Sequence, residues 1–146
     1  MGATDANGAG SVHGGVVMKL CDEVAGLAAI RHARQRVVTA AVDRLTFLHP
    51  VYVGEVLTLK ACVNAAWRTS TEVGVRVEAE NPFTGEIRHT SSAYLTMVAI
   101  DEQGAASRVP ALVAETPAAQ QREREAQVRR ATRLAEREQI IAEREP

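Results

Sequence analysis

The chain has 146 residues and a mass of 15.7 kDa, with 46% hydrophobic and 24% charged residues. These proportions are typical of one folded domain, with or without an appendage, and they exclude a wholly disordered chain. Seventeen basic and eighteen acidic residues give a net charge of −1, so nothing attracts the whole chain to nucleic acid or to an anionic membrane surface.

Signals for export or membrane insertion are absent from the sequence. No apolar run approaches the roughly 20 residues that span a bilayer, and the first residues lack the basic and apolar regions of a secretory signal. Cys21 and Cys62 lie in apolar segments without metal-ligand spacing, so we expect two buried free thiols in a reducing compartment. The expected location is therefore the cytoplasm, without membrane or nucleic-acid partners.

The first predicted element is a helix that begins at Gly14, in the segment GGVVMKLCDEVAGLAAIRHA. Apolar or small residues occupy nearly its whole circumference, and Arg31 and His32 mark a last turn where cations suit the helix dipole. A helix that is apolar all round is buried inside a protein, so we expect other layers to cover it.

Four predicted strands follow the helix: VVTAAVDRLTF, VLTLKACVNAAW, TEVGVRVEAE and IRHTSSAYLTMVAI. The third alternates most cleanly, with Val73 and Val75 on one face and Glu72 and Arg76 on the other. One helix and about four antiparallel strands predict an α+β layer fold with the sheet wrapped around the helix. A sheet of this size covers only one face of the helix. We therefore expect a second subunit to cover the other face.

Composition changes near Thr116–Pro117, which divides the chain into a body, residues 1–116, and a charged helical tail, residues 117–146. The tail has no glycine or aromatic residue and is rich in good helix formers. Its apolar residues are too sparse for a coiled-coil seam. Two interpretations stay open: a solvated helix, or an arm that docks on a partner subunit.

The glycine-rich segment TDANGAGSVHGG, directly before the predicted helix, is the main candidate for a site. Gly14 and Gly15 would leave backbone N–H groups exposed at the positive end of the helix dipole, where they could stabilise an oxyanion. The alternative is that these glycines only provide a flexible entry to the helix. His13 is either an acid–base group or a capping residue, and Asn7 either orients water or a carbonyl or only forms a turn.

A carboxylate further along the helix is the second candidate. Asp22 lies among small and apolar residues, where partial desolvation would raise its pKa and make it a better base. Helical spacing does not choose between Asp22 and Glu23, and either can be ordinary surface polarity. With the helix-entry amides, such a base suits hydrolysis at an acyl carbon. Serine-elbow, metal-ligand and phosphate-loop motifs are missing, so neither a metal site nor a nucleotide cofactor is expected.

Three blocks, ANGAGSVHGGVVMKLCDEVAGLAAIRHA, VVTAAVDRLTFLHPVYVGEVL and RTSTEVGVRVEAEN, resemble the acyl-CoA thioesterases of the hotdog fold. The resemblance is to the cytosolic (brain) acyl-CoA hydrolase group and its bacterial single-domain relatives, and it runs from about Thr4 to Glu115. It implies an antiparallel sheet wrapped around a long central helix, and two sheets joined edge to edge in a homodimer. Active sites would lie at the dimer interface, and dimers would assemble further into homohexamers, as trimers of dimers.

The resemblance also implies residue roles. Asp22 matches the family's catalytic carboxylate, a general base or nucleophile, and Asn7 matches an asparagine that reaches the same site from the other subunit. His13, Gly14 and Gly15 match the helix-entry turn whose amides polarise the thioester carbonyl. The chain carries both members of the Asn/Asp pair, so a homodimer would build two sites. CoA would be part of the substrate, and no other cofactor is implied.

Contacts with the CoA nucleotide require cations and hydroxyls along the sheet, for which Thr39, Arg68 and Ser70 are the candidates. Relatives carry an additional strand before the DAN segment, and here either that strand is lost or the start of the chain is truncated. The lack of the strand would open a sheet edge near Asn7. Two other functions compete with hydrolysis: a hotdog enoyl-CoA hydratase, and a non-catalytic acyl-CoA-binding or assembly module that uses the tail as its contact. Release of free CoA separates the first function from the other two.

Overall fold

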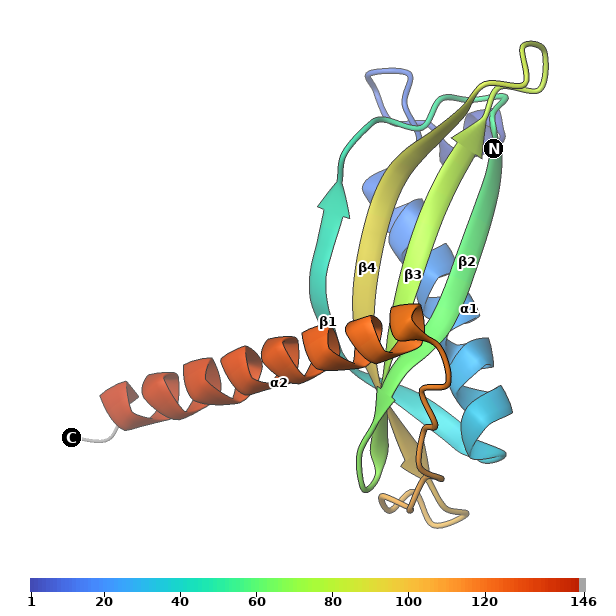
Figure 1. The fold of residues 1–146 in the computed structure, drawn as a ribbon. Helices are drawn as coiled ribbons and strands as arrows, with labels where there is room; N and C mark the ends of the chain where they lie inside the picture. Colours follow the sequence, from blue (N-terminus) through green and yellow to red (C-terminus); the bar gives the residue numbers. More distant parts are fainter. Residues whose placement is uncertain (145–146) are drawn as a thin grey trace.

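A four-stranded antiparallel sheet with strand order β1-β4-β3-β2 lies between two helices (Figure 1). The elements are η1 (Ala3–Asp5), α1 (Gly14–Ala33), β1 (Arg36–Phe47), β2 (Val56–Ala66), β3 (Ser70–Glu80), β4 (Ile87–Ile100) and α2 (Pro117–Arg144). The structure is a computed structural model that describes residues 1–144, so the last two residues of the predicted tail lie outside it. The predicted α+β class and the predicted order of elements are confirmed.

Neither helix within residues 1–144 combines the length and hydropathy that crossing a membrane requires.

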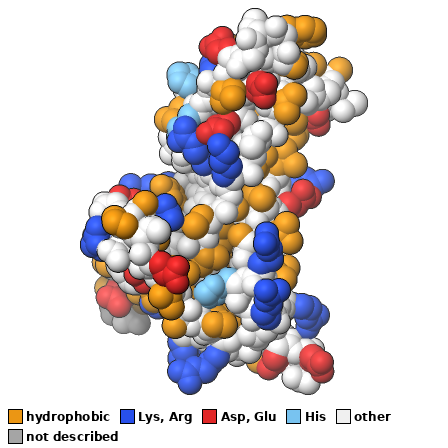
Figure 2. Space-filling view, turned by 45° about the vertical axis from the view of Figure 1, so that its right-hand side comes forward, with side chains coloured by type: hydrophobic (Ala, Val, Ile, Leu, Met, Phe, Trp, Pro, Cys, Tyr) orange, Lys and Arg blue, Asp and Glu red, His pale blue; other side chains and the backbone are white. Residues whose placement is uncertain are grey.

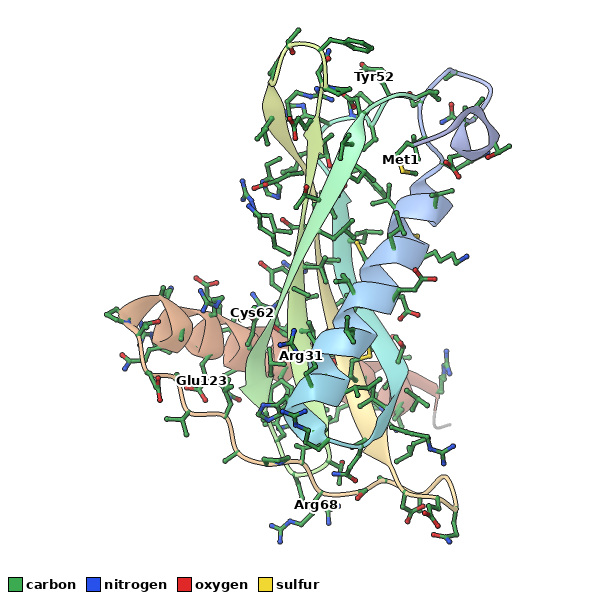
Figure 3. All side chains as sticks on the ribbon, turned by 90° about the vertical axis from the view of Figure 1, so that its right-hand side faces the viewer. Met1, Arg31, Tyr52, Cys62, Arg68 and Glu123 are labelled. Atoms are coloured by element: carbon green, nitrogen blue, oxygen red, sulfur yellow. The ribbon has the colours of Figure 1, made fainter. Side chains whose placement is uncertain are left out.

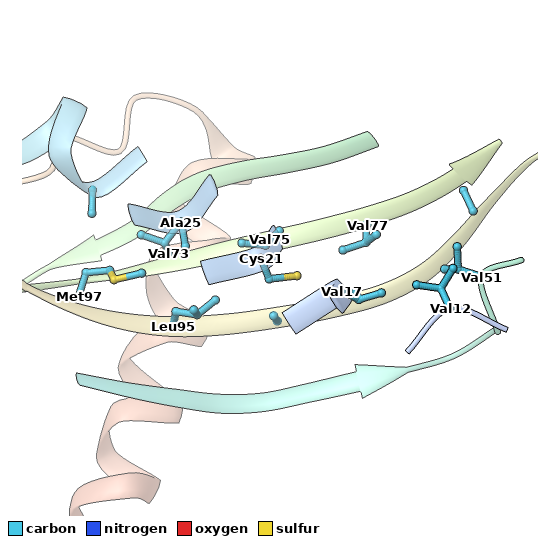
Figure 4. Packing of buried hydrophobic residues seen from close by; sticks show 13 residues of the cluster. Val12, Val17, Cys21, Ala25, Val51, Val73, Val75, Val77, Leu95 and Met97 are labelled. Atoms are coloured by element: carbon cyan, nitrogen blue, oxygen red, sulfur yellow. The ribbon is translucent and has the colours of Figure 1, made fainter. Parts of the chain in front are cut away.

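The stripe of α1 that faces the sheet is made of small side chains. Val17, Cys21, Ala25 and Ala29 recur every four residues and are almost completely buried. Small side chains let the helix lie close to the strands, whose inner face supplies the larger core residues Val73, Val75, Val77, Leu95 and Met97 (Figure 4). The alternation predicted for β3 is therefore confirmed.

The opposite side of α1 has no cover in the single chain. Leu27 is exposed there, and Met18 and Ile30 are exposed along the flank of the helix, although each is a large apolar residue. Strand β1, at the edge of the sheet, also exposes large apolar side chains, and Figure 2 shows apolar atoms reaching the surface among the charged ones. A helix that is apolar all round thus has a sheet on one side only, which agrees with the sequence expectation that a second subunit covers the rest.

The two cysteines differ in environment. Cys21 is buried, and burial raises the pKa of its thiol to about 11, so it stays protonated and packs as a small apolar residue. Cys62 is exposed, so the prediction that both thiols are buried is wrong for this residue. It pairs with Gly74 in the ladder between β2 and β3, on the face of the sheet away from α1.

Helix α2 lies against the outer face of the sheet, on the side opposite α1 (Figures 1 and 3). Glu72 of β3 is 0% exposed beneath it, and Arg129 binds that carboxylate through two nitrogens, with Nη2 2.7 Å from Oε1 and Nε 3.1 Å from Oε2. The guanidinium of Arg129 also lies 3.7 Å from the ring centroid of Tyr94. The interpretation of the tail as a solvated helix is therefore wrong for the part of α2 around Arg129, because Arg129 neutralises a buried carboxylate of the sheet.

The ion pair between Arg129 and Glu72 generates a stability prediction. Arg129→Ala leaves a buried carboxylate without its cation, so we expect the free energy of unfolding to fall by about 3–5 kcal/mol. Urea unfolding followed by circular dichroism measures the change. Arg124→Ala, an exposed arginine on the side of the same helix that faces away from the sheet, is the control and should change it by less than about 0.5 kcal/mol. A loss for Arg129→Ala no larger than for the control would contradict the prediction.

Candidate active site

The segment before α1 forms a tight loop around Asn7. The side-chain oxygen Oδ1 of Asn7 accepts the backbone N–H groups of Ala9, at 2.9 Å, and Ser11, at 3.2 Å. This Asx-type turn uses the oxygen to hold the loop. Among residues 1–144 the amide nitrogen of Asn7 has no hydrogen-bond partner, so its two N–H donors are available to a ligand.

Helix α1 begins directly after this loop with two unpaired amides. The carbonyl of His13, the capping residue, accepts the N–H groups of Val16 and Val17, whereas the N–H groups of Gly14 and Gly15 have no acceptor within the described chain. A Cβ atom on Gly15 would meet nothing within 4 Å. Glycine costs about 0.5–1 kcal/mol relative to alanine inside a helix. No contact within the single chain therefore requires glycine at position 15.

Asp22 lies two turns further along α1, where Thr39 of β1 holds its carboxylate. The hydroxyl of Thr39 donates to Oδ1 of Asp22 at 2.5 Å. Glu23, in contrast, points away and lies 3.9 Å from Lys19 in an exposed ion pair. The geometry thus separates two carboxylates that sequence spacing left equivalent. Thr39, which sequence analysis offered as a CoA contact, contacts Asp22 in the single chain and is placed to orient it.

Asp22 borders an apolar hollow of about 270 Å³ between α1 and the strands β1 and β4. Its apolar lining residues are Met18, Cys21, Val42, Leu45, Ala93 and Leu95. The expected desolvation of Asp22 is not present in the single chain, because the residue is exposed and only the sheet supplies a wall. A second wall on the open side of α1 would complete the enclosure.

Strand β1 is irregular where it lines this hollow. Its pairing with β4 shifts between Thr39 and Ala41 and again between Asp43 and Thr46, and Arg44 has a left-handed backbone with φ 52°. Bulges of this kind change which side chains point to each face of a sheet. The second one lets Val42 and Leu45 both line the hollow, with Asp43 on the side of α2.

The two parts of the candidate site lie apart within one chain. Asn7 and Gly14 line a hollow of about 400 Å³ near the helix start, whereas Asp22 lines the 270 Å³ hollow. An α-helix rises 1.5 Å per residue, which places Asp22 roughly 12 Å along the axis from Gly14. A carbonyl held by the helix-entry amides would therefore be out of reach of the Asp22 carboxylate of the same chain.

The remaining predicted CoA contacts lie at the other end of the molecule. Arg68 is in the hairpin between β2 and β3, far from Met1 and the Asn7 loop (Figure 3). Ser70 precedes Thr71, which is buried and pairs with the core residue Met97, so Ser70 faces the outer side of the sheet. The single chain does not bring either residue to Asp22.

A nearly buried ion pair that sequence analysis missed supports the Asn7 loop. Arg88 donates two hydrogen bonds to the carboxylate of Glu55, from Nη1 to Oε1 at 2.7 Å and from Nη2 to Oε2 at 3.0 Å. The backbone N–H of Tyr52 also donates to Oε2, at 2.9 Å. Tyr52 in turn bridges to Ser11 in the loop that begins at Asn7. The sequence indicates a turn at Gly54-Glu55, but no local pattern indicates that Glu55 pairs with Arg88 of β4.

This ion pair gives a prediction on pH. The hydrogen bond from Arg88 lowers the pKa of Glu55 in the folded chain. A carboxylate with a lowered folded pKa contributes stability above its unfolded pKa of about 4.3 and loses it as pH falls through the folded value. We expect wild type to melt above Glu55→Gln at pH 6, with the difference shrinking below about pH 4. Calorimetric melting temperatures from pH 3 to 7 measure it, and a difference independent of pH would contradict the prediction.

Comparison with known proteins defines the class. Residues 9–85 match the profile of the Thioesterase superfamily, and the chain belongs to this family. The human cytosolic acyl coenzyme A thioester hydrolase is 37% identical over 118 residues, which is 80% of this chain and 31% of that protein. Protein VdlD of two Helicobacter pylori strains is 43% identical over 98 residues, which is 67% of this chain and 56% of that protein, so the chain spans only part of the length of these relatives. Within residues 1–144 no three His, Cys, Asp or Glu side chains are grouped to hold a metal ion.

Solved structures confirm the hotdog fold that the resemblance implied. An apo hexameric acyl-CoA thioesterase superposes with a TM-score of 0.90 and 38% identity, covering 93% of this chain and 87% of that one. The acyl-CoA hydrolase of Staphylococcus aureus, solved with butyryl coenzyme A and coenzyme A, has a TM-score of 0.87 and 32% identity, covering 97% and 88%. The same enzyme has also been solved with alanine in place of an asparagine, an aspartate or a threonine.

Proposed function

We propose that this protein is an acyl-CoA thioesterase that hydrolyses acyl-CoA to a fatty acid and free CoA. The observation that carries the proposal is the Asp22 carboxylate, held by Thr39 at the edge of an apolar hollow, in a chain of the thioesterase superfamily. A positioned base beside an apolar slot suits a substrate with a reactive carbonyl and a hydrocarbon tail. We also propose the cytoplasm as its location, in line with the name of the human cytosolic relative, and CoA enters the reaction only as part of the substrate.

The hollow beside Asp22 has a size that fits an acyl chain. Its volume is about 270 Å³. An apolar protein cavity of roughly 150 Å³ accepts one benzene molecule, so this hollow has room for about ten carbon atoms. The Cys21 thiol in its wall is kept protonated by its raised pKa, so it does not compete with water as a nucleophile.

The chemistry follows from the two oxygens of Asp22. Oδ1 accepts the Thr39 hydroxyl, which leaves Oδ2 to take a proton from water as the water oxygen bonds to the thioester carbon. The carbonyl electron pair moves to its oxygen, where the N–H groups of Gly14 and Gly15 stabilise the oxyanion. Collapse breaks the C–S bond, and CoA leaves as a thiolate that takes the proton back; a thiol pKa near 8.5 makes this easy without a dedicated acid. If Asp22 instead attacked the thioester carbon directly, the CoA thiolate would leave and an anhydride between Asp22 and the acyl group would form. Water would then hydrolyse this anhydride, with the same net products.

A complete site requires two copies of the chain in this proposal. Asp22 of one copy meets Asn7 and the helix-entry amides, with His13 beside them, of the other copy. Three observations support this: the separation of roughly 12 Å within one chain, the free donors of Asn7, and the uncovered side of α1. The asparagine, aspartate and threonine replaced in the S. aureus variants are also separated along that chain by the same intervals as Asn7, Asp22 and Thr39.

The assembly proposed is a homodimer that associates further as a trimer of dimers, in line with the hexameric state of a similar solved enzyme. Its sheets would join at the free edge strand β1, where large apolar side chains are exposed. A long exposed edge strand is a ready template for pairing with another chain. Arg68 and Ser70 stay predicted contacts of the CoA nucleotide.

Release of free CoA from acyl-CoA, followed with a thiol reagent, tests the function. We expect wild type to release CoA and Asp22→Ala to lose about 10²–10⁴-fold in kcat, the usual contribution of a positioned base. Glu23→Ala is the matched control, since Glu23 is the adjacent carboxylate outside the hollow, and it should keep its rate. An undiminished rate in Asp22→Ala would remove this residue from the mechanism. Tight binding without CoA release would indicate a binding module, and hydration of enoyl-CoA would indicate a hydratase.

Mixing two inactive variants tests whether each site uses both copies. Asn7→Ala and Asp22→Ala are each expected to be nearly inactive alone. In a mixed dimer one site combines an intact Asn7 with an intact Asp22, while the other has lost both. Random reassortment makes half of the dimers mixed, so we expect about a quarter of wild-type activity to return on mixing. If both residues act from the same copy, every site carries a defect and mixing restores nothing.

A further inference from the structure

Helix α2 is longer than its path across the sheet. Along the helix its contacts advance towards the sheet edge: Arg129 binds Glu72 on β3, and one turn later Arg133 binds Asp43 on β1. Because β1 is the edge strand, the helix leaves the sheet soon after this pair, and residues 137–144 extend past the edge (Figure 1). These residues amount to roughly 12 Å of helix. We call them the overhang of α2.

The side of α2 that faces the sheet continues along the overhang. Ala126, Arg129 and Arg133 lie on this side, and Ala126 is completely buried. Two turns after Arg133 the same stripe reaches Ile140. Ile140 is 42% exposed and its neighbour Ile141 is 46% exposed. The overhang therefore presents an apolar face in line with the docked stripe, at a place where the sheet of its own chain has ended.

We propose that the overhang of α2 docks on the outer face of a second copy of this chain, over strands β1 and β4 of that copy. The inference rests on the proposed dimer, in which two sheets join at their β1 edges. Joining at this edge continues the outer face of the sheet directly beneath Ile140. Neighbouring strands lie about 4.8 Å apart, so an overhang of roughly 12 Å covers about two of them.

The outer face of β1 and β4 is suited to receive an apolar side chain. Val37 packs towards the core and Thr39 holds Asp22, so Val38 between them points to the outer face, where it is exposed. Its partner across the ladder is Val98 of β4. Since a two-fold dimer uses the same patch on both copies, each copy would give one overhang and receive one. Two α2 helices would then bridge the junction of the sheets, on the face away from the active sites.

Site-specific photo-crosslinking tests the proposal on the full chain. A benzophenone side chain placed at position 140 should give a covalent dimer on a denaturing gel. The crosslink should map to tryptic peptide 37–44 of β1 or peptide 89–108 of β4. The control places the same group at Ala135, which lies on the opposite side of α2 and is exposed, and it should give no covalent dimer. Crosslinks from position 140 to other surfaces of the second copy would overturn the proposal.

A second measurement uses dimer affinity. Ile140→Asp with Ile141→Asp should raise the dissociation constant of the dimer about tenfold or more, because two apolar contacts are lost. Ala135→Asp is the matched control and should leave that constant unchanged, and sedimentation measures both. The proposal for the overhang would be overturned if the dissociation constant of the double variant were unchanged while wild type sedimented as a dimer or larger and released CoA. That result would leave the proposed function intact. A wild type that is monomeric and releases no CoA would overturn the proposed function itself.

Discussion

Helix α1 is apolar nearly all round, while the sheet of its own chain covers only one side of it. The small residues from Val17 to Ala29 pack against the strands, and Met18, Leu27 and Ile30 are left facing outward. Leaving a continuous apolar face in water is unfavourable by about 25 cal/mol per Å². The single chain therefore has a strong physical reason to associate, and both the proposed active site and the proposed docking of α2 depend on the surface that association would cover.

The candidate site shows the same dependence at the level of chemistry. Thr39 fixes the orientation of Asp22, and β1 and β4 provide an apolar hollow beside it, but the carboxylate is still open to solvent. A base becomes stronger when water is excluded from it. The donors suited to a developing oxyanion, Asn7 and the first amides of α1, lie roughly 12 Å away in the same chain. A second copy would solve both problems at once, by closing the hollow and by supplying the donors.

Helix α2 uses the other face of the sheet. The outer side of β3 carries Glu72, which would face water if α2 did not cover the sheet. Arg129 of α2 neutralises the carboxylate of Glu72 beneath the helix. The charged composition of α2 thus has two parts: cations that pair with the sheet, and an overhang whose isoleucines extend past it. Association at β1 would join these features, since the helix crosses the sheet towards that edge.

The secondary structure followed from local pattern, because helical and strand periodicity are properties of neighbouring residues. The bounds of α1 and of all four strands agree with sequence expectation to within a residue, and the resemblance of the HGG and DEVAG blocks led to the family that comparison confirms. Contacts between distant residues had no such signal. The exposure of Cys62, the pairing of Glu72 with Arg129, and the support of the Asn7 loop by Glu55 and Arg88 arise only when separate elements pack. The sequence by itself determined the elements, their order and the candidate residues. The resemblance pointed to Asp22 rather than Glu23, but only the tertiary structure decided that Asp22 borders an apolar hollow and contacts Thr39, and that one chain keeps Asp22 apart from Asn7, because helix rise and strand register set those distances.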